Sequence, residues 1–199
     1  WMGYREDMIE KVAITGILHD IGILKFTQNE LDDFSFHKEL EMGAFSKHSM
    51  YGYELVKNKD LDQSIKQAVL THHEHADGSG FPLGVDNKSL NPIQRVIEIV
   101  DVYDTLLMRE PGFKRMSPFE VLIHLNEVEG NKYDPSALLI FTSRLAQTFI
   151  QCRVRLNNGQ EGKIVLFNKY SILRPLIQVG SGFVDLALRK DLNIVELLD

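Results

Sequence analysis

Residues 72–82 read HHEHADGSGFP, two adjacent histidines followed by a loop that no regular element can contain. Three glycines and one proline fall among the eight residues from Asp77 to Gly84, a composition that ends helices and strands. Before the loop, apolar residues at helical spacing lead into His72 and His73. Both imidazoles are therefore expected on the buried side of a helix end.

The segments on either side of this loop are also predicted to be helical. Apolar residues recur at helical spacing from about Tyr4 to Leu24, which places His19 and Asp20 near the end of that helix. His48 and Asp101 fall on two later helices. Capping residues predict the starts of four further helices, at Ser46, Asn91, Ser117 and Asp134.

The pattern changes after Gln151. Residues 153–156 and 163–166 alternate between apolar and polar, and Asn-Asn-Gly at 157–159 is a turn sequence, so together they predict a β-hairpin. Further short apolar runs follow at 175–179, 183–188 and 194–197. The sequence thus predicts an all-α helical core, residues 1–151, followed by a small β-rich C-terminal module, residues 152–199.

Composition narrows the class of protein. The 199 residues are 44% hydrophobic and 25% charged, which is typical of a soluble chain with a full core. The net charge of -6 would repel long nucleic acid. The single cysteine, Cys152, excludes an internal disulfide and cysteine-based zinc sites. No apolar run reaches the roughly 18 residues of a membrane helix, so we expect a cytoplasmic protein without membrane insertion.

Four candidate groups lie on or beside apolar helix faces: His19-Asp20, His48, His72-His73 and Asp101. An unpaired imidazole or carboxylate is unfavourable in such places, and a bound metal relieves that penalty. Mixed imidazole and carboxylate ligands suit first-row metals such as Mn, Fe, Co, Ni or Zn. Asp20 has two oxygens with which it could bridge a pair of metals.

These motifs in this order resemble those of the bacterial HD-GYP family. The similar stretches are LHDIG at 18–22, HSMYGYELV at 48–56, HHEHADGSGFP at 72–82 and VDVYDTL at 100–106. The resemblance runs from about Tyr4 to Ile150 and implies an all-α HD-domain helical core. The C-terminal segment is similar to a β extension found on some members. Active members of the family are signal-transduction hydrolases that cleave cyclic di-GMP.

Carried over residue by residue, the resemblance implies a centre of two or three divalent metal ions, with iron or manganese expected. The implied metal ligands are His19, Asp20, His48, His72, His73 and Asp101. Asp20 would bridge the metals, and a metal-bridged hydroxide would attack the phosphate. Lys25 is a second candidate catalytic residue, and the loop residues Gly78, Gly80, Phe81 and Pro82 are candidates for substrate binding.

The sequence departs from the family pattern at several places. Ile23 stands where the family usually has lysine, Phe81 replaces the tyrosine of GYP, and the segment that begins at Glu110 lacks the family's Arg-Pro-Tyr-Arg. The family also has a further histidine on a preceding helix, a position that would fall before Trp1, so that first helix is expected outside this sequence.

Three functions therefore stay open. The first is a phosphodiesterase for cyclic di-GMP or a related cyclic dinucleotide. The second is a catalytically weak module that binds a ligand or a signalling protein, which the departures at Ile23, Phe81 and Glu110 favour. The third is an HD phosphohydrolase that acts on another nucleotide.

Overall fold

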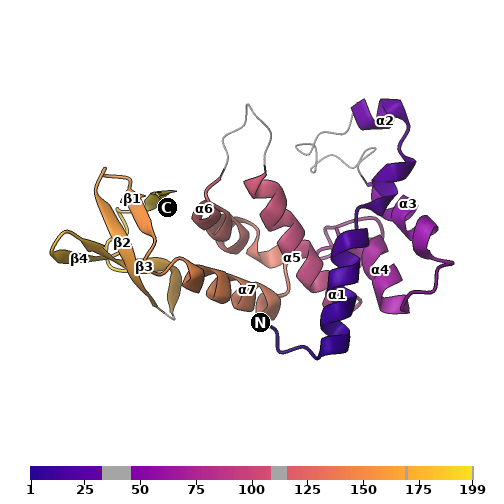
Figure 1. Cartoon of the computed structure of the whole chain (residues 1–199), viewed down its shortest axis with the longest axis horizontal. Helices are drawn as coiled ribbons and strands as arrows, with labels where there is room; N and C mark the ends of the chain where they lie inside the picture. Colours follow the sequence, from indigo (N-terminus) through magenta and orange to yellow (C-terminus); the bar gives the residue numbers. More distant parts are fainter. Residues whose placement is uncertain (33–45, 109–115, 169, 199) are drawn as a thin grey trace.

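The computed structural model describes residues 1–32, 46–108, 116–168 and 170–198, and the segment 110–113 lies outside them. The helices stand at one end and the sheet at the other, with α7 leading from the first to the second (Figure 1). The helices are α1 Glu6–Leu18, α2 Gln28–Asp32, α3 Lys47–Val56, α4 Gln63–Thr71, α5 Pro92–Leu107, α6 Pro118–Ile123 and α7 Pro135–Thr148. The 3₁₀ helices are η1 Ile21–Lys25 and η3 Gly130–Lys132, and η2 His124–Val128 is a π-helical segment. None of the described helices has the length and apolar character needed to span a membrane.

The four predicted helix starts are confirmed, since α3, α5, α6 and α7 each begin directly after the predicted residue. Capping depends on residues close in sequence, which makes such starts predictable. The Asn91 side chain accepts hydrogen bonds from the first turn of α5, and Asp134 does the same for α7. Ser117 and Glu120 form the reciprocal capping box at the start of α6. Local side chains therefore set the starts of α6, α7 and α5, the last of which carries Asp101.

The predicted continuous helix from Tyr4 to Leu24 is wrong. Helix α1 ends at Leu18, and the chain turns through His19 and Asp20 into η1. A close crossing explains the turn, since a Cβ atom on Gly22 would lie only 1.8 Å from the backbone oxygen of His48. Ile23 and Leu24 prolong the apolar pattern in sequence, but Leu24 is 81% exposed. The turn leaves the His-Asp pair at a corner beside α3.

The C-terminal strands form one antiparallel sheet in the order β4-β3-β2-β1-β5. The strands are β1 Arg153–Leu156, β2 Glu161–Asn168, β3 Ser171–Val179, β4 Gly182–Asp185 and β5 Ile194–Leu197. The predicted hairpin is confirmed by the pairing of Arg153 with Lys163, and Gly159 in its turn has a φ of 84°. The chain thus has a helical N-terminal region and a five-stranded C-terminal sheet.

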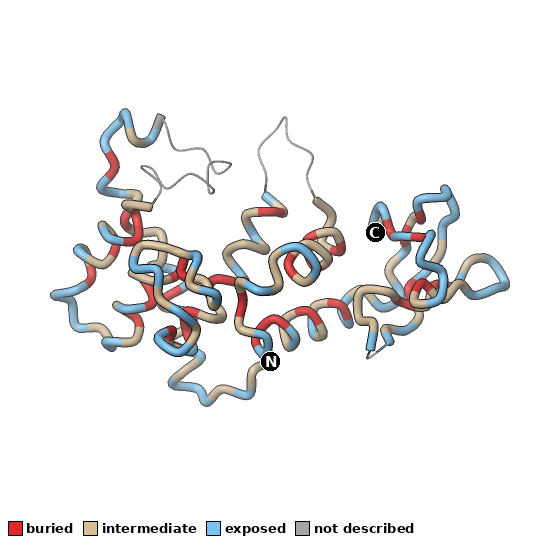
Figure 2. Tube along the Cα trace, turned by 180° about the vertical axis from the view of Figure 1, so that it is seen from behind, coloured by how far each residue is buried: buried red, intermediate tan, exposed pale blue. Residues whose placement is uncertain are grey.

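The sheet packs on the helical region through α6. Phe119 is fully buried with Val154, Ile164 and Ile177, which line the inner face of the sheet. Val121, two residues further along α6, belongs instead to the core between α5 and α7. Buried segments continue through α3, α4 and α5 to the region of the His-Asp corner (Figure 2). One short helix therefore contributes to both cores.

Candidate metal centre

Helix ends and one helix face bring the six candidate ligands together. His19 follows the last residue of α1, Asp20 precedes η1, and His72 follows the last residue of α4. Their ligand atoms form two groups, within each of which all the atoms lie within 4.8 Å of one another. The first group contains Asp20, His48, His72 and His73, and the second contains His19, Asp20 and Asp101.

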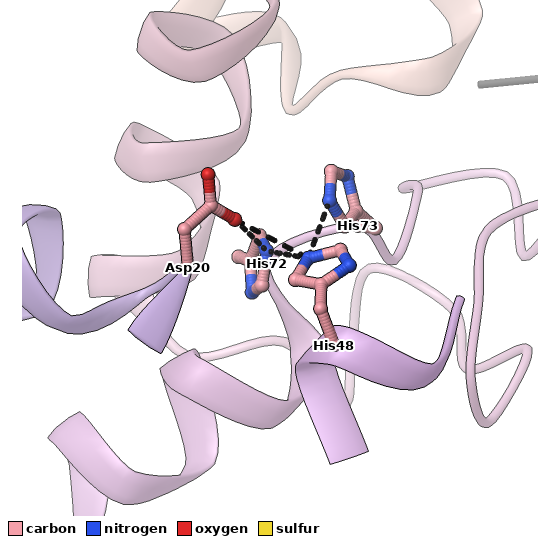
Figure 3. A group of neighbouring side chains, drawn as sticks. All are labelled: Asp20, His48, His72 and His73. Atoms are coloured by element: carbon pink, nitrogen blue, oxygen red, sulfur yellow. Dashed lines mark hydrogen bonds and ion pairs between the residues drawn. The ribbon is translucent and has the colours of Figure 1, made fainter. Parts of the chain in front are cut away.

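The first group is a cluster of three imidazoles facing one carboxylate oxygen (Figure 3). The Nε2 atom of His48 lies 3.0 Å from Nε2 of His72 and 3.2 Å from Nε2 of His73. The Oδ1 atom of Asp20 lies 3.3 Å from Nε2 of His48 and 3.7 Å from Nε2 of His72. All three imidazoles are buried, and their Nε2 atoms converge on one point.

The second group uses the other oxygen of the same aspartate. The Nε2 atom of His19 lies 3.5 Å from Oδ2 of Asp20 and 3.4 Å from Oδ1 of Asp101. The Asp20 side chain is 39% exposed and that of Asp101 is 17% exposed, whereas that of His72 is fully buried. Asp20 therefore stands between the two groups, and the carboxylates form the side of the site that is open to solvent.

The donor set of the first group suits a cation. The Nδ1 atom of His72 lies 2.9 Å from the Val69 carbonyl, to which it donates, so in the neutral ring Nε2 carries a lone pair. One hydrogen at most can occupy each contact of His48 with His72 and with His73. With neutral imidazoles, Nε2 of His48 carries either a hydrogen or a lone pair. In neither tautomer can it form hydrogen bonds with His72, His73 and Asp20 at the same time. A metal that accepts every lone pair removes the conflict.

Protonation differs between the histidines of the two ligand groups. Although burial opposes protonation, the hydrogen bond with Asp101 and the charge of Asp20 raise the pKa of His19 to about 9. Burial, together with the neighbouring His72 and His48, lowers the pKa of His73 well below its ordinary value. His73 is thus a neutral imidazole, whose nitrogen lone pair is available to a metal.

The loop after the histidine pair is anchored by Glu74. Its buried carboxylate accepts hydrogen bonds from the backbone amides of Leu83, Gly84 and Val85. Glu74 therefore fixes the conformation of this loop. The loop in turn holds Phe81 against His73, with the rings stacked at 4.7 Å between centroids.

The other predicted site residues lie on η1 and in the loop after the histidines. A Cβ atom on Gly80 would lie within 2.4 Å of the backbone of Glu74 and His75, so the structure explains glycine here by its own backbone packing. Gly78 adopts a φ of 79°. Lys25 is exposed on η1, with its Nζ atom 5.5 Å from the centroid of the Tyr51 ring. The assignments of Gly78, Gly80, Phe81, Pro82 and Lys25 to substrate or catalysis stay predictions.

Two buried polar residues of α5 are not predicted from the motifs. Gln94 is fully buried and Glu98 almost fully. The Oε1 atom of Glu98 lies 2.7 Å from Nδ1 of His75. Burial raises the pKa of the Glu98 carboxyl to about 7, while His75 opposes the shift. Their spacing could have indicated them, because residues 94, 98 and 101 share one face of a helix.

The HD domain family matches residues 3–137, and the chain belongs to this family. The chain is 24% identical to the cyclic di-GMP phosphodiesterase PA4108 of Pseudomonas aeruginosa, over 87% of the chain and 42% of that protein. It is 28% identical to the cyclic di-GMP phosphodiesterase response regulator RpfG of Xanthomonas campestris, over 73% of the chain and 40% of that protein. It is 27% identical to the 3'3'-cGAMP-specific phosphodiesterase 1 of Vibrio cholerae, over 77% of the chain and 36% of that protein. The chain thus spans about two fifths of the length of these relatives.

A solved structure supports the fold. Bd1817, described as an HDG"Y"P protein from Bdellovibrio bacteriovorus, superposes with a TM-score of 0.53 at 21% identity. The match covers 66% of this chain and 42% of that chain. This match supports the fold of the helical region, and the HD domain match together with the phosphodiesterase relatives confirms the resemblance that the sequence motifs indicate.

Proposed function

We propose that the chain is a metal-dependent phosphodiesterase that hydrolyses cyclic di-GMP or a related cyclic dinucleotide. The observation that carries the proposal is the position of Asp20, whose two oxygens face two separate groups of candidate metal ligands. One carboxylate between two ligand groups is the arrangement that a pair of divalent cations needs. The names of the relatives, which are phosphodiesterases for cyclic di-GMP or 3'3'-cGAMP, support this substrate class.

The residues of the two groups would hold two divalent cations, and we propose iron or manganese. When bound, such cations lower the pKa of a water ligand and neutralise charge on a phosphate. His48, His72 and His73 would form the buried floor of the site. Asp20 and Asp101, which are more exposed, would face the incoming phosphodiester. Substrate would therefore approach from the carboxylate side.

The loop after the histidines would contact the substrate beside the metals. Phe81 is half-buried and stacked on His73, so its ring would offer an apolar face close to the ligand cluster. Gly78, Gly80 and Pro82 would shape this loop around the substrate. Because Glu74 fixes the far end of the loop through three amides, this face is formed before substrate binds.

We propose Lys25 as a proton donor to the leaving oxygen. Its ammonium group lies over the Tyr51 ring, so the side chain would have to leave that ring to reach a phosphodiester at the metals. A Lys25→Ala variant should lose kcat while it keeps its metals. Unchanged turnover would eliminate Lys25 as the acid.

Residues 1–151 would form the catalytic unit and residues 152–199 an appended module, in a cytoplasmic signalling protein. This division agrees with the change from α7 to β1, and the shared burial of Phe119 would couple the two parts.

The test is turnover of cyclic di-GMP by protein loaded anaerobically with iron or manganese, with products separated by chromatography and 3'3'-cGAMP as a parallel substrate. We expect a linear dinucleotide that appears only with metal. Asp20→Asn should abolish turnover, since an amide cannot supply two anionic oxygens. Asp62→Asn, which changes an exposed aspartate at the start of α4, is the matched control.

A second candidate function is the catalytically weak binding module. Ile23 supplies no proton at the place where the family has lysine, and the Lys25 ammonium lies over the Tyr51 ring. In that case protein that holds its metals would bind cyclic di-GMP in a calorimeter but release no linear product.

A further inference from the structure

One face of α5 carries three polar residues in line. Gln94, Glu98 and Asp101 are separated by four and three residues, so their side chains leave the helix on the same side. Gln94 is 0% exposed and Glu98 is 2% exposed. The first two are therefore buried beside the helix turn that presents Asp101 to the candidate metal centre.

These buried side chains hold the segment that follows the histidine pair. The Nε2 group of Gln94 donates a 2.8 Å hydrogen bond to the backbone carbonyl of Glu74. The Oε1 atom of Glu98 lies 2.7 Å from Nδ1 of His75. Gln94 and Glu98 are also joined to each other, at 3.3 Å from Nε2 to Oε2. The segment is thus attached to α5 at two consecutive residues.

We propose that Gln94 and Glu98 are positioning residues of the metal centre. They hold His72 and His73 at a set distance from Asp101, because the segment after the histidines is bonded to the helix that carries Asp101. This inference rests on the proposed function, since it concerns the two groups of ligands that would hold the metals. Neither side chain belongs to the two groups of candidate metal ligands among the described residues.

Stability alone does not account for this pair. Ile93 and Ile97 of the same helix pack in the core with apolar contacts only. By contrast, the Oε1 atom of Gln94 is buried with no hydrogen-bond partner among the described residues, an arrangement that lowers stability. Hydrogen bonds are directional, whereas apolar contacts allow sliding. The pair therefore fixes a position at some expense of stability.

The test uses manganese(II) alone as the probe. Gln94→Met keeps the length of the side chain but removes both hydrogen bonds, and Glu98→Leu removes the contact with His75. In Glu98→Gln the amide can donate to Nδ1 of His75 and its oxygen can accept from Gln94, so both contacts survive. Thr142→Val is the matched control, because Thr142 is a buried polar residue of α7 that accepts from Asn126.

Three quantities are measured for each variant: manganese bound per chain, its dissociation constants, and the electron paramagnetic resonance spectrum of the bound ions. Gln94→Met and Glu98→Leu should weaken manganese binding by about 10- to 100-fold, the usual effect of losing a residue that orients a ligand. Their spectra should lose the coupling between neighbouring ions. Glu98→Gln should restore wild-type affinity and coupling, and Thr142→Val should change neither.

Unchanged affinity and coupling in Gln94→Met and Glu98→Leu would overturn the inference, as would an equal loss in Thr142→Val. If one disruptive variant fails to fold, the other still decides. The outcome is separate from that of the proposed function. Wild-type protein that binds coupled manganese but hydrolyses no cyclic dinucleotide would remove the function and keep the positioning role. Wild-type protein that binds no manganese would overturn both.

Discussion

Replacement of Gly22 by alanine tests the close crossing that forms the His-Asp corner. The new Cβ atom would lie 1.8 Å from the His48 oxygen and 2.5 Å from the Gly52 nitrogen. Cβ contacts under 3.0 Å are essentially never seen, so η1 and α3 must separate by at least 1.2 Å. Both contacts are with backbone atoms, which cannot rotate away. We expect a loss of unfolding free energy of about 3 kcal/mol or more, the upper part of the range for overpacked cores.

The separation would also pull Asp20 away from His48, two residues whose ligand atoms are 3.3 Å apart. Denaturant unfolding of metal-free protein measures the stability, and equilibrium dialysis against manganese measures the site. Gly16→Ala is the matched control, because its Cβ would meet only a side-chain atom of Ile97 at 3.7 Å. Gly16 lies in the last turn of α1, where that change should raise stability by up to about 0.5–1 kcal/mol. Equal effects of the two substitutions would refute the role assigned to Gly22.

Three further predictions concern buried groups. Glu74→Ala removes three hydrogen bonds to a carboxylate, but water can hydrate the freed amides, so we expect a loss of about 3 kcal/mol of unfolding free energy. Hydrogen exchange at residues 83–85 should become faster, and unchanged exchange would contradict the anchoring role. Burial raises the pKa of the Glu98 carboxyl from 4.5 to about 7, so the folded chain binds this proton more tightly than the unfolded chain. Metal-free wild type should therefore lose up to about 3 kcal/mol of unfolding free energy relative to Glu98→Gln as the pH rises from 4.5 to 7. A difference between the two proteins that does not vary with pH would refute this. Phe119→Ala should lower the unfolding free energy by about 3–5 kcal/mol and loosen the sheet and α6 together. Fluorescence and circular dichroism should then report one unfolding transition. A sheet that keeps its protection from hydrogen exchange in this variant would exclude the shared core.

Features that depend on neighbouring residues could be predicted from the sequence. The start of α5 after Asn91 and the hairpin turn at Gly159 follow from capping and turn chemistry within a few residues. The grouping of the histidines with Asp20 and Asp101 was indicated by their motifs and their apolar surroundings. The structure brings all six of these side chains together.

Features that depend on distant segments could not be predicted in the same way. The end of α1 at Leu18 is set by the approach of α3, about thirty residues later, while the local apolar pattern continues through Leu24. The roles of Glu74 and Glu98 depend on which backbone and side-chain groups fold against them. A buried carboxylate has no periodic signal of its own, because its partners are chosen by the tertiary structure.

The central claim is that Asp20 stands between two metal ions, and anomalous diffraction from crystals of manganese-loaded protein tests it most directly. We expect two peaks, one among Asp20, His48, His72 and His73 and the other among His19, Asp20 and Asp101. Each peak should lie within bonding distance of a different oxygen of Asp20. A single peak, or two peaks of which neither contacts Asp20, would contradict the claim.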